Sequence, residues 1–370
     1  MTEGFKEQAN GSVETSEQYD FPLLEKVAEH YRSLPHEVGE TYLVCCQHLL
    51  EPQKHMFEKL ISFGFDPLKI RILGKIYSTN EEIQTELSEM GINAIQPSFT
   101  GASFDNEHQE NCREMINEIP NDSPVILLDD GGQLITESVV SGKRILFAVE
   151  QTSSGYRKLE GKEIPFPVLN VARSTTKLVQ ESPFIARHAC ERMKTYFIEN
   201  GLPKPTILIV GLGPIGEAVQ QYFVREGFSV SGVDSKHGHT DLVATINAQK
   251  PDIVIGATGS NILTPEEMEK ISVDSAVHFI SVSSSDREFP VVAYREGQMP
   301  AHGDVRYKNF TFVNNGFPIT FKGYKNEAYP KEMEKTMSLL SGAVMHGATA
   351  STLQNGLIDL PEELEKLVNE

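Results

Sequence analysis

The sequence predicts an α/β protein built from two doubly wound domains, and three observations support that fold class. The chain has 370 residues, and at about 150 residues per domain this length corresponds to two or three domains. Short apolar runs alternate with amphipathic stretches in two successive series, as expected for β-α units with mostly parallel strands. A glycine-rich turn follows directly on the first apolar run of the second series.

The first series of β-α units lies within residues 19–182, which we predict as the first domain. Before it, residues 1–18 are polar and rich in serine and glutamate, so a disordered tail is expected. The amphipathic stretches Pro52–Phe63 and Asn80–Met90 are predicted helices. The predicted strands are Tyr42–Cys46, Ile70–Leu73, Ala94–Gln96, Val125–Asp129, Ile145–Val149 and Val168–Val171.

A helix from Pro183 to Asn200 is predicted to connect the two domains. Ser182 is its expected N-cap, because serine caps helices well and proline is favoured at the first helical position. Gly201 is the expected stop. The second series then begins with Thr206–Val210, a continuous apolar run typical of a buried parallel strand.

The second domain is predicted over residues 183–331. Two further helices follow near the C-terminus, at Pro330–His346 and Pro361–Val368. Both have apolar faces that need a partner. We therefore expect residues 332–370 to pack back on the first domain, which makes the second domain an insertion.

Charge and composition argue against several classes of protein. There are 33 Lys and Arg residues against 52 Asp and Glu residues, and the net charge of −19 is spread along the chain. Nucleic acid is therefore not an expected partner, because phosphates are bound by clustered cations. The chain has no run of 18 apolar residues and no recognisable leader, so a cytoplasmic protein without a membrane partner is predicted.

Cysteine and histidine spacing indicates neither disulfides nor a metal site. The four cysteines are Cys45, Cys46, Cys112 and Cys190. No C-x-x-C pattern occurs, and the adjacent Cys45 and Cys46 are predicted to be reduced packing residues. His237 and His239 have no third ligand at a useful spacing. No metal is therefore predicted.

The turn Gly211-Leu-Gly213-Pro214-Ile215-Gly216 fits the pattern G-x-G-x-x-G between a strand and a helix over Glu217–Glu226. Gly211 allows the tight turn, Gly213 allows the backbone to approach a pyrophosphate, and Gly216 allows the helix to pack on the strand. Pro214 and Ile215 begin the helix, whose free N–H groups face the anion. The turn predicts a dinucleotide-binding Rossmann domain.

The cofactor predicted for this domain is NAD. Asp234 follows the next strand, Ser229–Val233, where a carboxylate binds the adenosine ribose diol and repels a 2′-phosphate. Lys236 is near enough in sequence to weaken that preference. Thr258 and Gly259 follow the strand Asp252–Ala257, at the edge where loops of a parallel sheet reach a ligand.

Several short motifs occur together in one order along the chain. They are Lys75-Ile-Tyr-Ser-Thr79, Asp129-Asp-Gly-Gly132, Glu150-Gln-Thr-Ser-Ser-Gly155, Asn170 through Lys177, the glycine-rich turn, and Ala257-Thr-Gly259. In these motifs the chain resembles the S-adenosylhomocysteine hydrolase family from about Phe21 to about His346. The resemblance implies a split substrate domain around a central NAD domain, and a homo-oligomer.

The resemblance also implies a reaction cycle. In this family NAD⁺ oxidises the 3′-hydroxyl of a nucleoside, a base removes the acidified neighbouring proton, and the 5′ substituent leaves. Water then adds and the ketone is reduced, so the cofactor is regenerated. Lys177 matches the lysine beside the nicotinamide, Glu181 stands where the family has aspartate, and Asp130 and His48 match an aspartate and a histidine of the active site. Positioned acid–base groups of these types contribute about 10²–10⁴ in rate.

The same resemblance assigns further contacts. Thr152, Ser153 and Ser154 match hydroxyl groups that touch NAD. Ser283 and Thr320 stand at two further positions near the cofactor, Thr320 in place of an asparagine. Gln151, together with Asp130 and Lys177, is expected to contact the substrate, although an amide accepts less strongly from a ribose diol than the family's glutamate.

The chain departs from the family at other positions. Leu50 stands where the family recognises adenine, Ala186 replaces a cysteine, and Ser284 replaces a histidine. The C-terminal family segment that reaches a neighbouring protomer's NAD has no counterpart after Leu367. The redox half is thus matched better than the adenosyl-recognising half, which predicts a changed, nucleoside-like substrate.

Two other functions stay open at this point. One is an NAD-dependent dehydrogenase with net redox on another hydroxylated substrate, and the other is a non-catalytic, NAD-binding regulatory protein. Each motif also has a plain structural explanation. His48 could bond to the backbone at a strand end, the aspartate and glycine motif could be a turn, and Lys177 with Glu181 could be an exposed helix pair.

Overall fold

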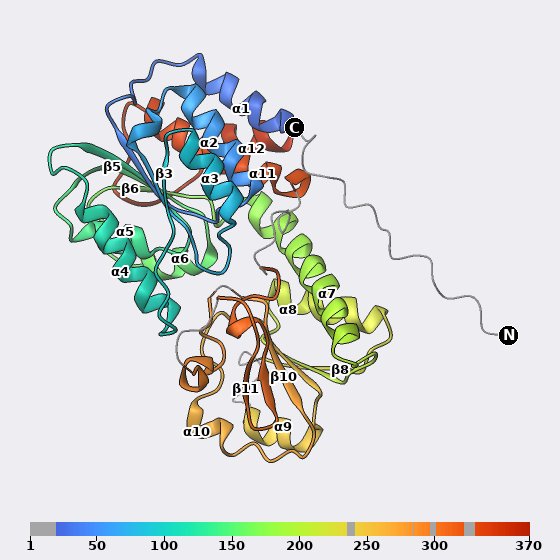
Figure 1. Ribbon diagram of the computed structural model, residues 1–370. Helices are drawn as coiled ribbons and strands as arrows, with labels where there is room; N and C mark the ends of the chain where they lie inside the picture. Colours follow the sequence, from blue (N-terminus) through green and yellow to red (C-terminus); the bar gives the residue numbers. More distant parts are fainter. Residues whose placement is uncertain (1–19, 235–240, 284, 297–300, 322–329) are drawn as a thin grey trace.

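Two parallel-sheet domains lie one beside the other in the computed structural model (Figure 1), which describes residues 20–234, 241–283, 285–296, 301–321 and 330–370. The chain is α/β, as the alternation of apolar and amphipathic segments predicts. The tail over residues 1–18, Lys236, His237, His239 and Ser284 all lie outside the described residues.

The first sheet has seven parallel strands in the order β13-β6-β5-β4-β1-β2-β3. Its strands are β1 (Tyr42–Cys46), β2 (Ile70–Leu73), β3 (Asn93–Ile95), β4 (Pro124–Asp129), β5 (Arg144–Glu150), β6 (Pro167–Asn170) and β13 (Gly356–Asp359). The six strands predicted for this half occur within one residue of their expected ends. The edge strand β13 was missed, because four residues that begin with glycine give too short an apolar run.

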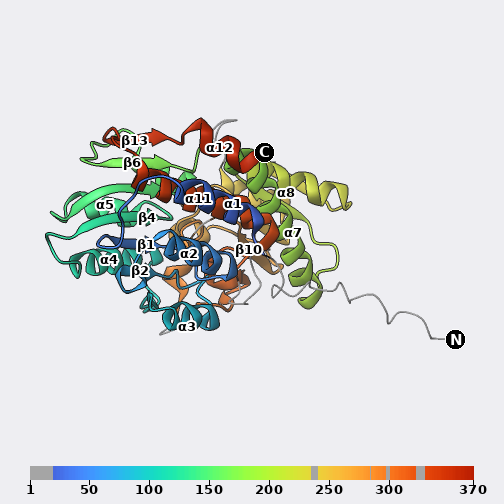
Figure 2. The ribbon, with the colours of Figure 1, turned by 90° about the horizontal axis from the view of Figure 1, so that it is seen from above.

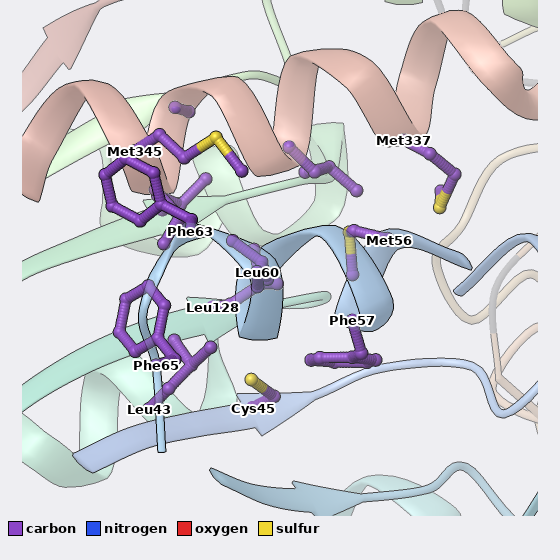
Figure 3. Packing of buried hydrophobic residues seen from close by; sticks show 14 of the residues in the cluster. Leu43, Cys45, Met56, Phe57, Leu60, Phe63, Phe65, Leu128, Met337 and Met345 are labelled. Carbon is purple, nitrogen blue, oxygen red and sulfur yellow. The ribbon is translucent and has the colours of Figure 1, made fainter. Parts of the chain in front are cut away.

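Helices cover both faces of this sheet. One core cluster joins the sheet to α1 (Pro22–Arg32), α2 (Glu51–Phe63), α3 (Glu81–Glu89), α11 (Pro330–Thr349) and α12 (Glu362–Asn369). The other joins it to α4 (Phe104–Asn117), α5 (Gln133–Val139) and α6 (Ser153–Leu159). Alternation along β1 places Leu43 and Cys45 in the first cluster, where Figure 3 shows them near Phe57 and Leu60, and places Val44 and Cys46 in the second.

The second sheet has the strand order β11-β12-β10-β9-β7-β8, with β11 antiparallel and the other strands parallel. Its strands are β7 (Ile207–Val210), β8 (Val230–Val233), β9 (Ile253–Gly256), β10 (Val277–Ser281), β11 (Val305–Tyr307) and β12 (Phe310–Phe312). Its helices are α7 (Ser182–Glu199) and α8 (Pro214–Arg225) on one face, with α9 (Leu242–Gln249) and α10 (Pro265–Met268) on the other. Short 3₁₀ turns occur at η2 (Pro67–Lys69), η5 (Val291–Tyr294) and η6 (Val313–Gly316).

The connecting helix begins earlier than the sequence suggests. A π-helical segment, η3 (Thr176–Glu181), runs directly into α7, and Ser182 has helical backbone angles of φ −59° and ψ −44°. The prediction that Ser182 is an N-cap was therefore wrong. Pro183 lacks the N–H of an α-helical bond, and a π turn accommodates such a break without ending the helix. The result places Lys177 and Glu181 on one helical turn.

The C-terminal helices lie over the first sheet, where α11 packs beside α1 and α2 and α12 packs beside α11 (Figure 2). Leu339, Leu340 and Val344 of α11 are fully buried in the same cluster as the first-sheet strands. Among the described residues, no helix combines the length and the apolar character needed to cross a bilayer.

A histidine on α2 makes the stability of the first domain sensitive to pH. Burial alone would lower the pKa of His55, but contacts to Glu51 at 3.2 Å and Glu58 at 2.8 Å raise it to about 9. Since the folded pKa exceeds the unfolded value of about 6.5, this stabilisation is fully present below pH 6.5 and is lost as the pH rises through 9. After allowance for solvent screening we expect about 1–2 kcal/mol.

We therefore expect urea unfolding of His55→Gln and of the unchanged protein to differ by that amount at pH 6 and to converge above pH 9. Taking the difference between the two proteins at each pH cancels the titration of other groups. A constant difference across this range would contradict the assignment.

Candidate active site

Polar side chains gather at the carboxyl ends of four adjacent strands of the first sheet. Asn170 ends β6, Gln151 follows β5, Asp130 follows β4 and His48 follows β1. Asn170, Gln151 and Asp130 are buried, and the side chain of His48 is 14% exposed. Carboxyl ends of parallel strands are the usual ligand edge of such a sheet.

Asp130 is the centre of this group. Its carboxylate accepts a hydrogen bond from Lys75 Nζ through one oxygen, and its other oxygen lies 3.3 Å from His48 Nε2. His48 Nδ1 is 2.5 Å from Ser78 Oγ. The structure thus brings His48 and Asp130 into direct contact, and adds Lys75 and Ser78, which the sequence did not indicate as site residues.

The charges of this group are fixed by its surroundings. Burial alone would raise the pKa of Asp130, but Lys75 and His48 hold it well below its usual range. Burial alone would lower the pKa of Lys75, and Asp130 instead raises it. Burial lowers the pKa of His48, against the opposing effect of Asp130 and with added repulsion from Lys75 and Lys177. At neutral pH the group therefore holds an ammonium, a carboxylate and a neutral imidazole.

Several buried polar atoms at this edge have no hydrogen-bond partner among the described residues. They include Gln47 Oε1 and Nε2, Gln151 Oε1 and Asn170 Oδ1. Buried polar groups in folded proteins are nearly always paired, with protein, water or a ligand. These atoms therefore mark positions where a polar ligand or ordered water would be bound.

Lys177 and Glu181 form a second pair on η3. Lys177 Nζ donates to Glu181 Oε1, and Glu181 Oε2 accepts from Thr336 Oγ of α11 at 2.5 Å. Both side chains are largely buried, at 11% and 9% exposure, so this is not the exposed helix pair that the sequence left open. Glu181 borders a separate cavity of about 470 Å³, which Thr176, Phe184 and Thr336 also line.

The glycine-rich turn of the second domain fits a dinucleotide. A Cβ on Gly216 would lie 1.9 Å from the carbonyl oxygen of Gly211, and Gly211 itself has φ +97°. A Cβ on Gly213 would meet nothing within 4 Å, so the space above this residue is open. Gly213 is the N-cap of α8 and has no capping side chain, which leaves the first N–H groups of the helix for an anion.

Asp234 closes the same turn from the end of β8. Its Oδ2 accepts from the backbone N–H of Leu212 at 2.6 Å. The carboxylate is thereby held beside the turn, at the position where the ribose of an adenosine group lies in Rossmann domains.

A buried glutamate supports the next loop and was not predicted from the sequence. Glu288 is fully buried and accepts from the N–H groups of Thr258 at 2.6 Å and Gly259 at 3.0 Å. It also accepts from Ser281 Oγ at 2.6 Å and Ser283 Oγ at 3.1 Å. Glu288 therefore positions Thr258, Gly259 and Ser283 together. No spacing rule in the sequence signals it, because its partners come from two strand ends.

The predicted hydroxyl run faces the second domain from the start of α6. Thr152 caps α6 by accepting from the N–H of Gly155 at 3.0 Å. Ser154 Oγ lies 3.4 Å from Arg287 Nη1, whereas Ser153 bonds to Arg157 through its carbonyl oxygen. Thr320 is buried in the segment that leads from β12 to Phe321.

The two domains are closed on one another. Arg287 pairs with Asp105 of the first domain at 2.8 Å, and Arg295 donates to the carbonyl oxygens of Gly101 and Ala102. Aromatic rings fill the space between them, with Phe317 stacked on Tyr77 at 5.0 Å and Phe321 stacked on His48 at 4.8 Å. The remaining cavity, about 20 Å³ beside Lys75 and Asp130, holds about one water molecule. A substrate therefore enters only when the domains separate.

We expect Arg287→Met to shift the domains toward a more open state by about fivefold, since a partly exposed ion pair contributes up to about 1 kcal/mol. Small-angle scattering should show a larger radius of gyration. Arg113→Met is the matched control, because Arg113 pairs with Glu137 within the first domain at 2.8 Å. Equal radii for the two variants would contradict the role of Arg287.

The residues that depart from the resembled family have structural places too. Leu50 is buried directly before α2, and its apolar side chain fills the place predicted for adenine recognition. Ala186 is buried in the core between α7 and the second sheet. Ser284 lies outside the described residues.

Comparison with known proteins gives relatives in sequence and in fold. No family model matches the chain. It is 32% identical over 352 residues to two Mycobacterium tuberculosis proteins, "Uncharacterized protein MT0113" of strain CDC 1551 and "Uncharacterized protein Rv0104" of strain H37Rv, covering 89% of this chain and 68% of each relative.

Three solved structures are similar to the chain at TM-scores below 0.5. A dipicolinate synthase from Bacillus halodurans has a TM-score of 0.42 and 13% identity, covering 85% of this chain and 99% of its own. NAD⁺-bound 3-phosphoglycerate dehydrogenase from Entamoeba histolytica has 0.42 and 10%, covering 85% and 98%. NAD-dependent formate dehydrogenase from Staphylococcus aureus, in complex with NAD, has 0.41 and 11%, covering 85% and 100%. These likenesses are distant.

Proposed function

The chain belongs to the same family as the Mycobacterium tuberculosis proteins MT0113 and Rv0104, whose names state no activity, and we propose its function from the site. We propose an NAD-dependent enzyme that oxidises a secondary hydroxyl of a nucleoside-like substrate to activate the neighbouring C–H bond, as the resembled hydrolase family does. One observation carries this proposal: a buried ammonium, carboxylate and neutral imidazole lie at the ligand edge of one sheet, beside a second domain whose glycine turn fits a dinucleotide.

The residues for NAD fit the chemistry of the cofactor. Gly211, Gly213 and Gly216 leave room for the pyrophosphate at the start of α8, and Asp234 is placed for the ribose diol. Thr258 and Gly259, held by Glu288, lie against Gly211. When bound, NAD⁺ supplies the hydride acceptor for oxidation of the hydroxyl.

The first domain supplies proton transfer. Neutral His48 has the capacity to hold a proton, and Asp130 and Ser78 fix its ring orientation. Lys177, held by Glu181, is the proposed proton acceptor for the hydroxyl, by resemblance to the family. Gln151 and Asn170, with their unpaired amide oxygens, are placed to bind the substrate's polar groups. Closure of the domains excludes water from these groups.

The buried Leu50 and the aromatic ring of Phe321 over His48 favour a substrate other than an adenosyl thioether. The identity of the substrate is tested by denaturing the purified protein and identifying the released small molecules by mass spectrometry. Release of a nucleoside or a related sugar together with NAD supports the proposal. Release of neither, with no turnover of a nucleoside panel, contradicts it.

A dehydrogenase with net redox is a second candidate, because the groups that would recognise adenine are replaced by Leu50 while the redox groups are present. The absorbance of reduced nicotinamide separates the two functions. An enzyme with a closed cycle reduces at most its own bound cofactor, whereas a dehydrogenase converts added NAD⁺ in proportion to substrate.

We expect Lys177→Ala to slow cofactor reduction by about 10²–10⁴, the usual contribution of a positioned acid–base group, while NAD binding stays unchanged. Stopped-flow absorbance with the cognate substrate measures the rate, and calorimetry measures binding. Lys335→Ala is the control, because Lys335 lies on α11 and donates to Asn369 at 3.4 Å on the protein surface. An unchanged rate in Lys177→Ala would remove this residue from the mechanism.

A further inference from the structure

A cluster of two thiols and an imidazole lies buried beside the candidate active site. Cys46 is the last residue of β1, and His108 and Cys112 stand four residues apart on one face of α4. The Cys46 and Cys112 sulfur atoms are 3.3 Å apart, and one potential ligand atom from each of the three residues lies within 4.8 Å of the others. Exposure is 0% for both cysteines and 1% for His108.

His108 is a buried group that needs a partner. Neither of its ring nitrogens has a hydrogen-bond partner among the described residues. Burying an unpaired polar nitrogen costs about 1–3 kcal/mol in proteins, so a histidine with two such atoms is unusual in a core. The imidazole stacks on Phe104 at 4.9 Å, which fixes its plane but satisfies neither nitrogen. A bound ion beside the two thiols would satisfy one of them.

The sulfur separation fits a metal better than a disulfide. A disulfide bond is about 2.05 Å long, so the two sulfur atoms would have to approach by more than 1 Å. Two thiolates on a tetrahedral zinc ion, each at about 2.3 Å, lie about 3.8 Å apart. The observed 3.3 Å therefore needs a change of only about half an ångström.

We propose that Cys46, His108 and Cys112 bind one Zn²⁺ ion, with a water molecule as the fourth ligand. Thiolate and imidazole together select zinc among the common divalent ions. Two thiolates neutralise the ion, so the complete site is uncharged and suited to the interior. His108 also borders the cavity of about 20 Å³ between the domains, which has room for about one water.

This inference goes beyond the proposed function, since none of the three residues is among the proposed acid–base or NAD-binding groups. It also reverses the prediction that the chain has no metal site. The sequence contains no C-x-x-C pattern, and only the packing of α4 on β1 brings Cys46 to a pair of residues more than 60 positions away.

The test is Co²⁺ binding to the full chain, purified with a reductant and stripped of metal by a chelator. We expect one Co²⁺ per chain, with a thiolate-to-cobalt charge-transfer band and the visible bands of a tetrahedral site, and displacement of Co²⁺ by Zn²⁺. Cys112→Ser and His108→Gln should weaken binding by at least about tenfold, since even outer partners of metal ligands contribute that much. Cys45→Ser is the matched control, because Cys45 faces the opposite side of the same strand (Figure 3).

A measurement on the unchanged protein covers the case in which a core variant does not fold. Zn²⁺ bound to the native chain should raise Tm in proportion to the logarithm of its concentration above Kd. A cobalt spectrum without a thiolate band, or no Tm shift with Zn²⁺, would overturn the proposal. So would a Cys46–Cys112 disulfide found by peptide mass mapping of protein purified without reductant.

Discussion

Replacing Lys75 by methionine is expected to lower the free energy of unfolding by about 3–5 kcal/mol, the usual cost of removing one partner from a buried ion pair. The exposed fractions of the Lys75 and Asp130 side chains are 4% and 3%, so Asp130 would keep a buried charge without its main cation. Chemical denaturation at pH 7 measures the effect. The variant should also lose activity, because the charge that repels a proton from His48 is gone.

The control for Lys75→Met is Lys59→Met. Lys59 pairs with Glu25, and these side chains are 25% and 37% exposed, so solvent screens the interaction and the loss should stay below about 1 kcal/mol. The double variant Lys75→Met with Asp130→Asn should recover most of the stability, because no charge is left unpaired, but not the activity. If the single and double variants were equally unstable, packing of the lysine stem rather than charge would explain the loss.

Lys75 shows how far the sequence could lead at this site. The segment Lys75–Thr79 matches a motif of the resembled family, but the resemblance gives its lysine no role. The ion pair depends on the distance between the loop after β2 and the end of β4, two strands that are not neighbours in the sheet. No local spacing encodes that distance. The same is true of Glu288, whose partners stand at the ends of β9 and β10.

Features set by local patterns were predictable. The buried strands Tyr42–Cys46 and Ile70–Leu73 occur with the predicted ends, because continuous apolar runs have few other places in a soluble fold. The start of α7 was not predictable, since η3 arises where Lys177 and Glu181 pack against Thr336 of α11, more than 150 residues later. Tertiary packing decided the outcome there, and local capping rules did not.

The glycine-rich turn gives the second large effect, because its glycines have separable roles. Gly213 has φ −81°, which any residue adopts, and a Cβ there would point into open space. We expect Gly213→Ala to fold with a loss of at most about 1 kcal/mol, the difference between glycine and alanine at an N-cap. Its affinity for NAD should nevertheless fall by about 10–100-fold, since the methyl group stands where the pyrophosphate must approach the backbone.

Gly216→Ala should behave in the opposite way. Its Cβ would lie 1.9 Å from the Gly211 carbonyl oxygen, so α8 must move away from the strand and the free energy of unfolding should fall by about 3 kcal/mol. Calorimetric NAD titration and urea unfolding of both variants separate binding from folding. If Gly213→Ala bound NAD as tightly as the unchanged protein, the turn would serve only helix packing, and the space above it would not be the pyrophosphate site on which the proposed oxidation depends.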